Sequence, residues 1–287
     1  MLSVLGFIAA LCMATLAHAQ QPLKILHQFA PSAAFAIALN RFAEPLSAEL
    51  QRPVVFEGHS GAGGAVMMNS YQNQGDANTF LIAGTNPYVV IPMVQKVDYR
   101  TDDLEPLVMF ALSPMCYIAR SDVRDLDYRR WLADSRGKFY GSLGNATIEA
   151  VLLDNINRTE KLQQTGVNYK SYAEISLALL RNDIQWSIVP KNICTGLDPR
   201  AGSEQKLVEV RGVPAALDAS YWFGLFGRRG VDRRTLDTVS QAFVTAWFRN
   251  RETLSKTIHY PDRALRGDEF QKLIESDRRR WAELIKK

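Results

Sequence analysis

The chain has 287 residues, a length that suits two lobes of about 100–150 residues each. Its apolar fraction of 47% and charged fraction of 22% exclude disorder or a coiled coil as the main architecture. The net charge is only +4, and no concentrated basic face is evident. We therefore expect no nucleic-acid partner, since such binding needs a basic patch.

The first residues have the pattern of an export signal. Leu2–Leu16 is apolar and uncharged, and it is followed by the small-x-small sequence Ala17-His18-Ala19. We predict that residues 1–19 are a signal peptide cleaved after Ala19, which makes the mature protein periplasmic. Two alternatives are a lipoprotein acylated at Cys12 and a buried first helix.

Strands and helices alternate through the first part of the mature chain, which predicts an α/β lobe with a largely parallel sheet. Apolar runs predict the strands and helical spacing predicts the helices. The expected strands are 24–29, 53–56 and 79–83, and the expected helices are 35–50 and a segment ending near residue 71.

A second set of elements follows the long apolar run 109–119. The expected strands are 139–142, 184–189, 207–211 and 221–226, and the expected helices are one starting at Thr147, then 172–181, 232–249 and 267–285. We predict a second α/β lobe, joined to the first by extended crossovers near Cys116 and Pro190. The mature chain keeps two cysteines, Cys116 and Cys194, which form either one disulfide or two buried thiols.

Three turns rich in small residues each follow a strand and precede a helix. They are 29–36, 58–64 and 141–147. Helix N-termini in such positions carry unpaired N–H groups and a positive dipole end, which suit a carboxylate. The alternative is ordinary turn chemistry, with Thr147 or Asn145 capping its helix. The sequence has no motif for a metal or a cofactor, and we expect neither.

One loop also supports an enzymatic hypothesis. The sequence Gly58-His59-Ser60-Gly61-Ala62 approximates the nucleophile elbow of acyl hydrolases. A secreted serine hydrolase would then use Ser60 and His259, with Asp218, Asp232 or Asp237 as the acid. Against this, Ser60 follows only the second strand of the mature chain, which is early for that fold.

Five motifs, in order along the mature chain, resemble a known family. They are Pro53–Glu57 followed by Gly61–Gly64, the segment Tyr99–Leu107, the turn Tyr140–Thr147, the pair Tyr169-Lys170, and Trp222–Leu225. Together they resemble the Bug-type periplasmic solute-binding proteins, the extracytoplasmic receptors of tripartite tricarboxylate transporters.

The resemblance implies a two-lobed Venus-flytrap protein, not an enzyme, with lobe 1 at 20–115 and 222–287 and lobe 2 at 116–221. Such a protein captures a small organic carboxylate between its lobes and passes it to membrane subunits, and we expect a monomer. The family's ligand-contacting loops fall on this set of residues: Phe29, Ser32, Ala33, Phe35, Thr85, Asn86, Ser142, Asn145, Thr147 and Tyr169.

The first loop departs from the family pattern. Ala36 stands where relatives often have an acidic residue, and Phe35 stands where they have Thr or Ser. The missing acid and the added ring favour a carboxylate with an apolar or aromatic body over an amino acid. The alternative is that Phe35 packs into the core at the start of its helix.

Overall fold

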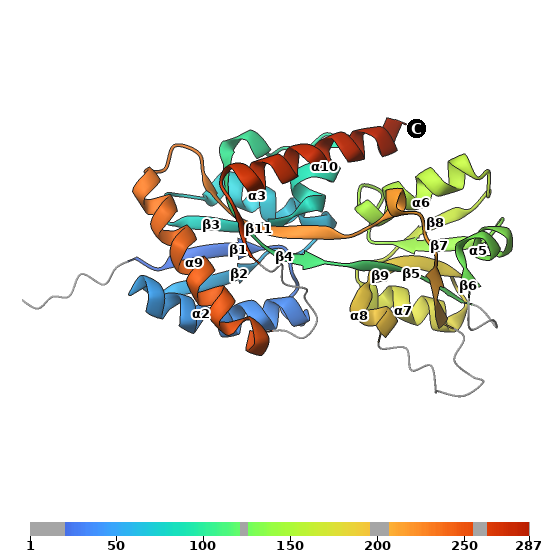
Figure 1. Ribbon diagram of the computed structural model, residues 1–287, viewed down its shortest axis with the longest axis horizontal. Coiled ribbons are helices and arrows are strands. Elements are labelled where there is room, and N and C mark those ends of the chain that lie inside the picture. Colours follow the sequence, from blue (N-terminus) through green and yellow to red (C-terminus); the bar gives the residue numbers. More distant parts are fainter. Residues whose placement is uncertain (1–20, 121–125, 196–206, 255–262, 287) are drawn as a thin grey trace, which may run out of the picture.

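The computed structural model describes residues 21–120, 126–195, 207–254 and 263–286. Two lobes lie side by side, each built on a six-stranded mixed sheet (Figure 1). We call the part built on the first sheet lobe 1 and the part built on the second sheet lobe 2. This is the two-lobed α/β architecture predicted from the alternation of strands and helices.

The sheet of lobe 1 has the strand order β12-β4-β11-β3-β1-β2. Its parallel pairs join β1 to β2 and β3, and its antiparallel pairs join β11 to β3 and β4, and β12 to β4. The strands are β1 (Leu23–His27), β2 (Val54–Gly58), β3 (Thr79–Gly84), β4 (Leu104–Ser113), β11 (Tyr221–Arg228) and β12 (Leu265–Arg266).

Helices cover both faces of this sheet. Alternate strand residues therefore enter different cores: Ile25 and Ile82 pack on the side of α2 and α9, and Leu26 and Leu81 pack on the side of α3. Every residue of β3 is buried, as expected for a strand covered on both faces. The helical segments are α2 (Ala34–Leu50), η1 (Ala62–Gly64), α3 (Ala65–Gln74), η2 (Asn86–Val90), α4 (Ile91–Val94), η3 (Thr101–Asp103), α9 (Arg233–Leu254) and α10 (Asp268–Lys286).

The sheet of lobe 2 has the order β6-β10-β5-β9-β7-β8. Its strands are β5 (Met115–Arg120), β6 (Leu126–Asp127), β7 (Phe139–Ser142), β8 (Thr165–Asn168), β9 (Trp186–Pro190) and β10 (Leu207–Arg211). Its helical segments are α5 (Tyr128–Asp134), α6 (Ile148–Thr159), α7 (Tyr172–Arg181), α8 (Lys191–Thr195) and η4 (Ala215–Leu217).

The chain passes from lobe 1 to lobe 2 at Pro114, between β4 and β5, and β11 returns it to the first sheet from Tyr221 onward. The observed crossing at Pro114 is two residues from Cys116, near which the sequence predicted a crossover. The one expected near Pro190 is wrong, because Pro190 pairs with Met115 inside the second sheet and the Lys191 N–H donates to the Pro114 carbonyl (2.9 Å).

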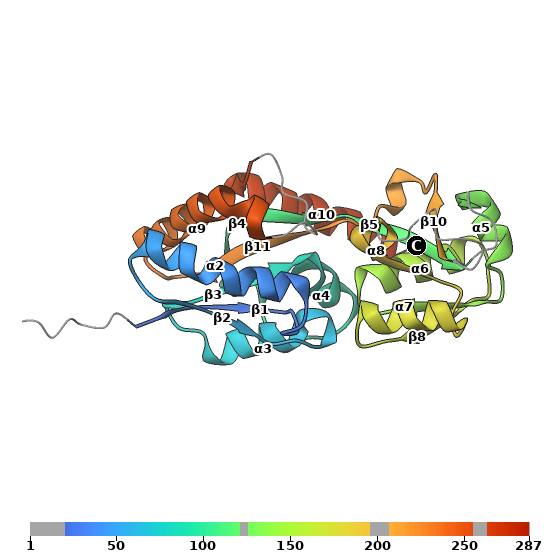
Figure 2. The same cartoon turned by 90° about the horizontal axis from the view of Figure 1, so that it is seen from below.

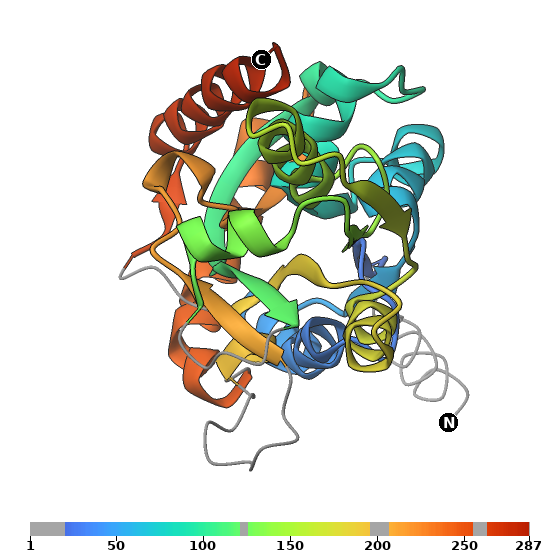
Figure 3. The same cartoon turned by 90° about the vertical axis from the view of Figure 1, so that its right-hand side faces the viewer.

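Helix α10 also links the lobes. It packs against the sheet of lobe 1 and extends over α6, where the Leu284 carbonyl accepts a hydrogen bond from Asn155 Nδ2 (3.0 Å; Figure 1). Viewed from the lobe 2 end, α10 lies on the opposite side of the molecule from α7 (Figure 3). One apolar core cluster includes residues of both lobes and of α10, for example Val90, Ile148 and Trp281.

Cys116 of β5 and Cys194 of α8 form a disulfide, with their Cα atoms 6.6 Å apart. Of the two states that the sequence allowed, the disulfide is therefore the one observed. It fastens α8 to the strand that begins directly after the crossing at Pro114.

Candidate ligand-binding site

The start of α6, in lobe 2, is the best-defined polar contact between the lobes. Thr147 is its N-cap residue: the hydroxyl accepts from the Ala150 N–H (3.4 Å) and donates to the Gly144 carbonyl (3.0 Å). The sequence allowed either Thr147 or Asn145 as the cap, and the structure selects Thr147. The next donor, the Ile148 N–H, points to lobe 1 and donates to Asn86 Oδ1 (2.8 Å).

Asn86 is held by two contacts within lobe 1. The neighbouring hydroxyl of Thr85 is fully buried and accepts from the Trp222 N–H of β11 (3.1 Å). On the other side, the Tyr99 hydroxyl donates to the Pro87 carbonyl (2.8 Å). Thr85 and Asn86, both expected site residues, therefore act differently: Thr85 fixes the backbone, and the Asn86 side chain reaches lobe 2.

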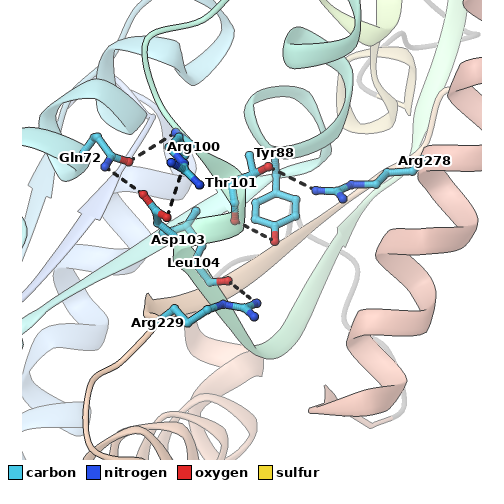
Figure 4. Close-up of polar contacts among 8 residues, drawn as sticks. All are labelled: Gln72, Tyr88, Arg100, Thr101, Asp103, Leu104, Arg229 and Arg278. Atoms are coloured by element: carbon cyan, nitrogen blue, oxygen red, sulfur yellow. Dashed lines mark hydrogen bonds and ion pairs between the residues drawn. The ribbon is translucent and has the colours of Figure 1, made fainter.

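The segment after Tyr99, which belongs to one of the five motifs, is tied to the elements around Asn86. Thr101–Asp103 is fastened by side chains from three elements (Figure 4). Gln72 Nε2 donates to Asp103 Oδ2 (3.2 Å), the Tyr88 hydroxyl to the Thr101 carbonyl (3.4 Å), and Arg278 to Thr101 Oγ1 (3.2 Å). The motif thus braces η2, the segment that carries Asn86.

Glu149 is the residue that the sequence analysis missed. It is the second residue of α6 and is 0% exposed. The Tyr172 hydroxyl of α7 donates to its Oε1, and its Oε2 has no hydrogen-bond partner among the described residues. Burial raises the pKa of Glu149, and the Tyr172 hydrogen bond, its own backbone N–H, and the side chains of Thr147 and Asn86 oppose that rise.

Aromatic hydroxyls extend this contact back to lobe 1. The Tyr172 hydroxyl also lies beside the Tyr221 hydroxyl, and Tyr221 lies beside Ser113 at the end of β4. Burial and the neighbouring Glu149 raise the pKa of Tyr221 to about 12 and the pKa of Tyr172 well above its ordinary value. Both hydroxyls therefore keep their protons at neutral pH, and Tyr172 is a permanent donor to Glu149.

The turn before α6 forms a short polar chain. Ser142 is buried, and its hydroxyl donates to Asn168 Oδ1 (3.1 Å), whose Nδ2 donates in turn to Asn145 Oδ1 (2.8 Å). The Tyr169 N–H donates to the Ser142 carbonyl (2.9 Å). Three expected site residues are therefore brought together, with Asn168 as an unpredicted link supplied by β8.

The glycine-rich loop after β2 packs against the same place. A side chain at Gly63 would touch Thr147 Cγ2 (3.4 Å), and one at Gly64 would lie 2.9 Å from the Pro87 ring. Gly64 also has φ +104°, a conformation that favours glycine. Gly63 and Gly64 thus allow the close approach between η1, η2 and α6.

The start of α2 differs from the start of α6. Its N-cap residue, Ala33, supplies no side-chain hydrogen bond, and its first turn has no acidic residue. Ser32 is exposed and Ala33 half-buried. The darker, N-terminal end of α2 points toward lobe 2 (Figure 2). Its first N–H groups have no capping side chain and suit an anion.

Phe35 lies in the core, as the packing alternative had it. It is 7% exposed, and its ring lies 4.6 Å from Phe29, 5.0 Å from Phe223 and 6.2 Å from Trp247, centroid to centroid. Phe29 is only half-buried, so it is the member of this cluster with surface left for contact.

No group of three or more His, Cys, Asp or Glu side chains within the described ranges could hold a metal ion. In the same ranges, no helix is both long and apolar enough to cross a membrane. Of the two helix starts, only the start of α2 lacks a capping side chain and so has N–H groups that suit an anion.

Comparison with known proteins identifies the family. Residues 39–196, more than half of the chain, match the model of TctC, the tripartite tricarboxylate transporter family receptor. The chain belongs to the TctC family. The resemblance inferred from the five motifs is thereby confirmed, and the family is one of receptors, not of enzymes.

Among curated proteins, the chain is similar to a UPF0065 protein of Bordetella pertussis. The two are 26% identical over 187 residues, which is 62% of this chain and 58% of that relative. The chain therefore aligns with less than two thirds of that relative's length.

Solved structures share the fold at low identity. The periplasmic binding protein BugD has a TM-score of 0.73 at 16% identity, covering 93% of this chain and 97% of its own. MatC of Rhodopseudomonas palustris, solved with malate, has 0.73 at 18%, with coverages of 92% and 98%. The R. palustris protein Rpa4515, solved with adipate, has 0.74 at 16%, with coverages of 93% and 97%. These likenesses confirm the two-lobed periplasmic binding protein fold.

The hydrolase hypothesis fails for this receptor. The candidate acids have other partners: Asp218 accepts from Ser220, Asp232 caps the start of α9 through Thr235, and Asp237 pairs with Arg233 (3.1 Å). Ser60 is exposed after β2. His259, like the predicted signal peptide and Cys12, lies outside the described residues.

Proposed function

We propose that this TctC receptor binds a small organic carboxylate between its lobes and delivers it to the membrane subunits of a tripartite tricarboxylate-type transporter. It would do so as a monomeric, periplasmic protein after cleavage behind Ala19. The lobe boundaries expected from the sequence belong to this proposal, and the separate sheets on either side of Pro114 support them.

The observation that carries the proposal is the uncapped start of α2. Its first-turn N–H groups are donors without a capping side chain, at the end of the helix that points to lobe 2 (Figure 2). A ligand carboxylate would satisfy them and benefit from the helix dipole. Charge-assisted hydrogen bonds contribute about 1.5–3 kcal/mol each, so a few of them suffice for micromolar affinity, about −8 kcal/mol.

The second half of the site would come from lobe 2. The expected residues there are at the end of β7, in the turn that leads into α6, and directly after β8: Ser142, Asn145, Thr147 and Tyr169. Phe29 would contact an apolar or aromatic part of the ligand, because its ring is only half-buried, whereas the Phe35 ring is buried in the core. Contacts to both lobes would favour the closed state, because a ligand shifts an equilibrium only through its different affinity for the two states.

The two ligand-bound relatives support the ligand class, since malate and adipate are both small organic acids. The test is calorimetry and thermal unfolding of the exported protein with a panel of mono- and dicarboxylates of three to six carbons. We expect micromolar binding and a raised melting temperature for at least one acid. A folded protein that responds to none of them would refute the proposal for ligands of this size.

A further inference from the structure

Glu149 is a buried acid without the partner that such a group normally has. Its side chain is 0% exposed, and none of the described side chains that act on its pKa is basic. Tyr172 satisfies Oε1, whereas Oε2 is buried with no hydrogen-bond partner among the described residues. An unsatisfied buried carboxyl oxygen is costly because it has lost its water and gained no donor, so its retention calls for an explanation.

The position of Glu149 suggests a role in binding. The carboxyl lies at the start of α6, near Thr147 and its own backbone N–H, and it is close to Asn86 and Tyr221 of lobe 1. A helix N-terminus between two lobes is where a ligand anion would be expected. Here the Ile148 N–H is already taken by Asn86, and a carboxyl of the chain itself stands beside it.

The two helix starts therefore offer a ligand opposite chemistry. The start of α2 presents N–H donors and no acid in its first turn, whereas the start of α6 presents a carboxyl oxygen that needs a donor. A second carboxylate placed beside Glu149 would put two acids in one buried setting, where they cannot both ionise without a large cost.

We propose that Glu149 sets the specificity of the site, so that the ligand has one carboxylate, bound at α2, and at its other end a hydroxyl or ammonium donor, bound by Glu149 Oε2. This inference rests on the proposed function and narrows its ligand class. It separates this receptor from the relatives solved with malate and adipate, because those ligands each carry two carboxylic groups.

A purely structural role for Glu149 makes a different prediction. If the carboxyl served only to fasten Tyr172 and the lobes, Glu149→Gln would change the stability of the protein but not the order in which it prefers ligands. Glutamine keeps an acceptor for Tyr172 and adds an N–H₂ donor that can pair with a carboxylate. The ligand preference is therefore the measurement that distinguishes specificity from packing.

The experiment compares the exported wild-type protein, Glu149→Gln and the control Glu160→Gln, which removes an exposed acid just past the other end of α6. Each is titrated by calorimetry with dicarboxylates, hydroxy-monocarboxylates and amino-monocarboxylates that carry their groups at the two chain ends, three to six carbons long. We expect the wild type and Glu160→Gln to bind a hydroxy or amino acid about tenfold or more tightly than the dicarboxylate of equal length. Glu149→Gln should shift that ratio by about tenfold or more toward the dicarboxylate. The hydroxy and amino series show which donor Glu149 prefers.

A wild-type preference for dicarboxylates would overturn the inference while leaving the proposed function standing, and it needs no variant to be measured. An unchanged ratio in a folded Glu149→Gln protein would overturn it as well. If none of the three folded proteins binds any compound, the proposed function itself fails.

Discussion

Capping the start of α2 should separate ligand binding from stability. Ala33 has the extended backbone of an N-cap residue (φ −70°, ψ 136°) but no side chain to accept a hydrogen bond. In Ala33→Asp, the new carboxylate would accept from the first-turn N–H groups that the proposed ligand uses. The chain's own acid and the ligand would then compete for the same donors.

The two effects have opposite signs. A new N-cap stabilises a helix by about 1 kcal/mol, and a negative charge at a helix start adds about 0.3–1 kcal/mol, so we expect the melting temperature to rise by about 3 °C. Ligand affinity should fall by about 3 kcal/mol, roughly 100-fold, from the loss of two charge-assisted hydrogen bonds. Scanning calorimetry of the free protein and titration with the best acid of the panel measure the two quantities.

Two further variants distinguish helix capping from added charge as the cause of the weaker binding. Ala33→Asn caps the helix without adding charge and should also weaken binding, whereas Asn40→Asp adds the same charge at an exposed position of α2 and should not. If Ala33→Asp raises the melting temperature but leaves affinity unchanged, the start of α2 does not bind the carboxylate, and the proposed site is wrong.

Other predictions concern stability. Burial, helped by the nearby His59, lowers the pKa of His27 to about 4; the unfolded chain binds this proton below about pH 6.5 and the native protein does not, so stability should fall by about 3 kcal/mol as pH drops from about 6.5 to 4. Urea unfolding across that range measures it, and a His27→Asn protein with the same pH dependence would contradict it. Removing the disulfide with Cys116→Ser and Cys194→Ser, which are 78 residues apart, should cost about 2–4 kcal/mol in urea unfolding; a double variant as stable as the oxidised wild type would count against this. Gly64→Ala should destabilise by about 2 kcal/mol or more, because φ is +104° and the Pro87 ring is in the way, whereas Gly144→Ala, at φ +135° with open space around it, should lose less; equal losses in thermal unfolding would refute the steric argument.

Most elements were predictable from the sequence because apolar spacing reflects burial. Where the pattern carried no such signal, the prediction was incomplete. The run 109–119 is two strands, β4 and β5, because Pro114 lies at the crossing between the lobes. Strand β8 has no buried residue, so its sequence has no apolar pattern from which a strand could be predicted. The π-helical turn η2 is buried throughout, and its pattern resembles neither a regular helix nor a strand.

The site was predictable only where local motifs place it. Thr147 as one of two candidate caps follows from residues close in sequence, and Asn86 as an expected site position follows from the family resemblance. The hydrogen bond from Ile148 to Asn86, however, joins positions 62 residues apart in different lobes. Glu149 escaped notice for a related reason. An acid in the first turn of a helix is ordinary and usually exposed, and only the docking of lobe 1 and α7 over α6 buries this one.

These contacts constrain what a ligand can do. The lobes already share the hydrogen bond from Ile148 to Asn86, the pair of Tyr172 with Tyr221, and the bond from Asn155 to α10. A ligand cannot promote closure through groups that are paired without it, because only a difference in affinity between the two states shifts their populations. Two groups that remain for it are the N–H donors at the start of α2 and Oε2 of Glu149, which has no hydrogen-bond partner among the described residues. One binds an acceptor and the other a donor, so on this argument the ligand enters with a fixed polarity, its carboxylate toward lobe 1.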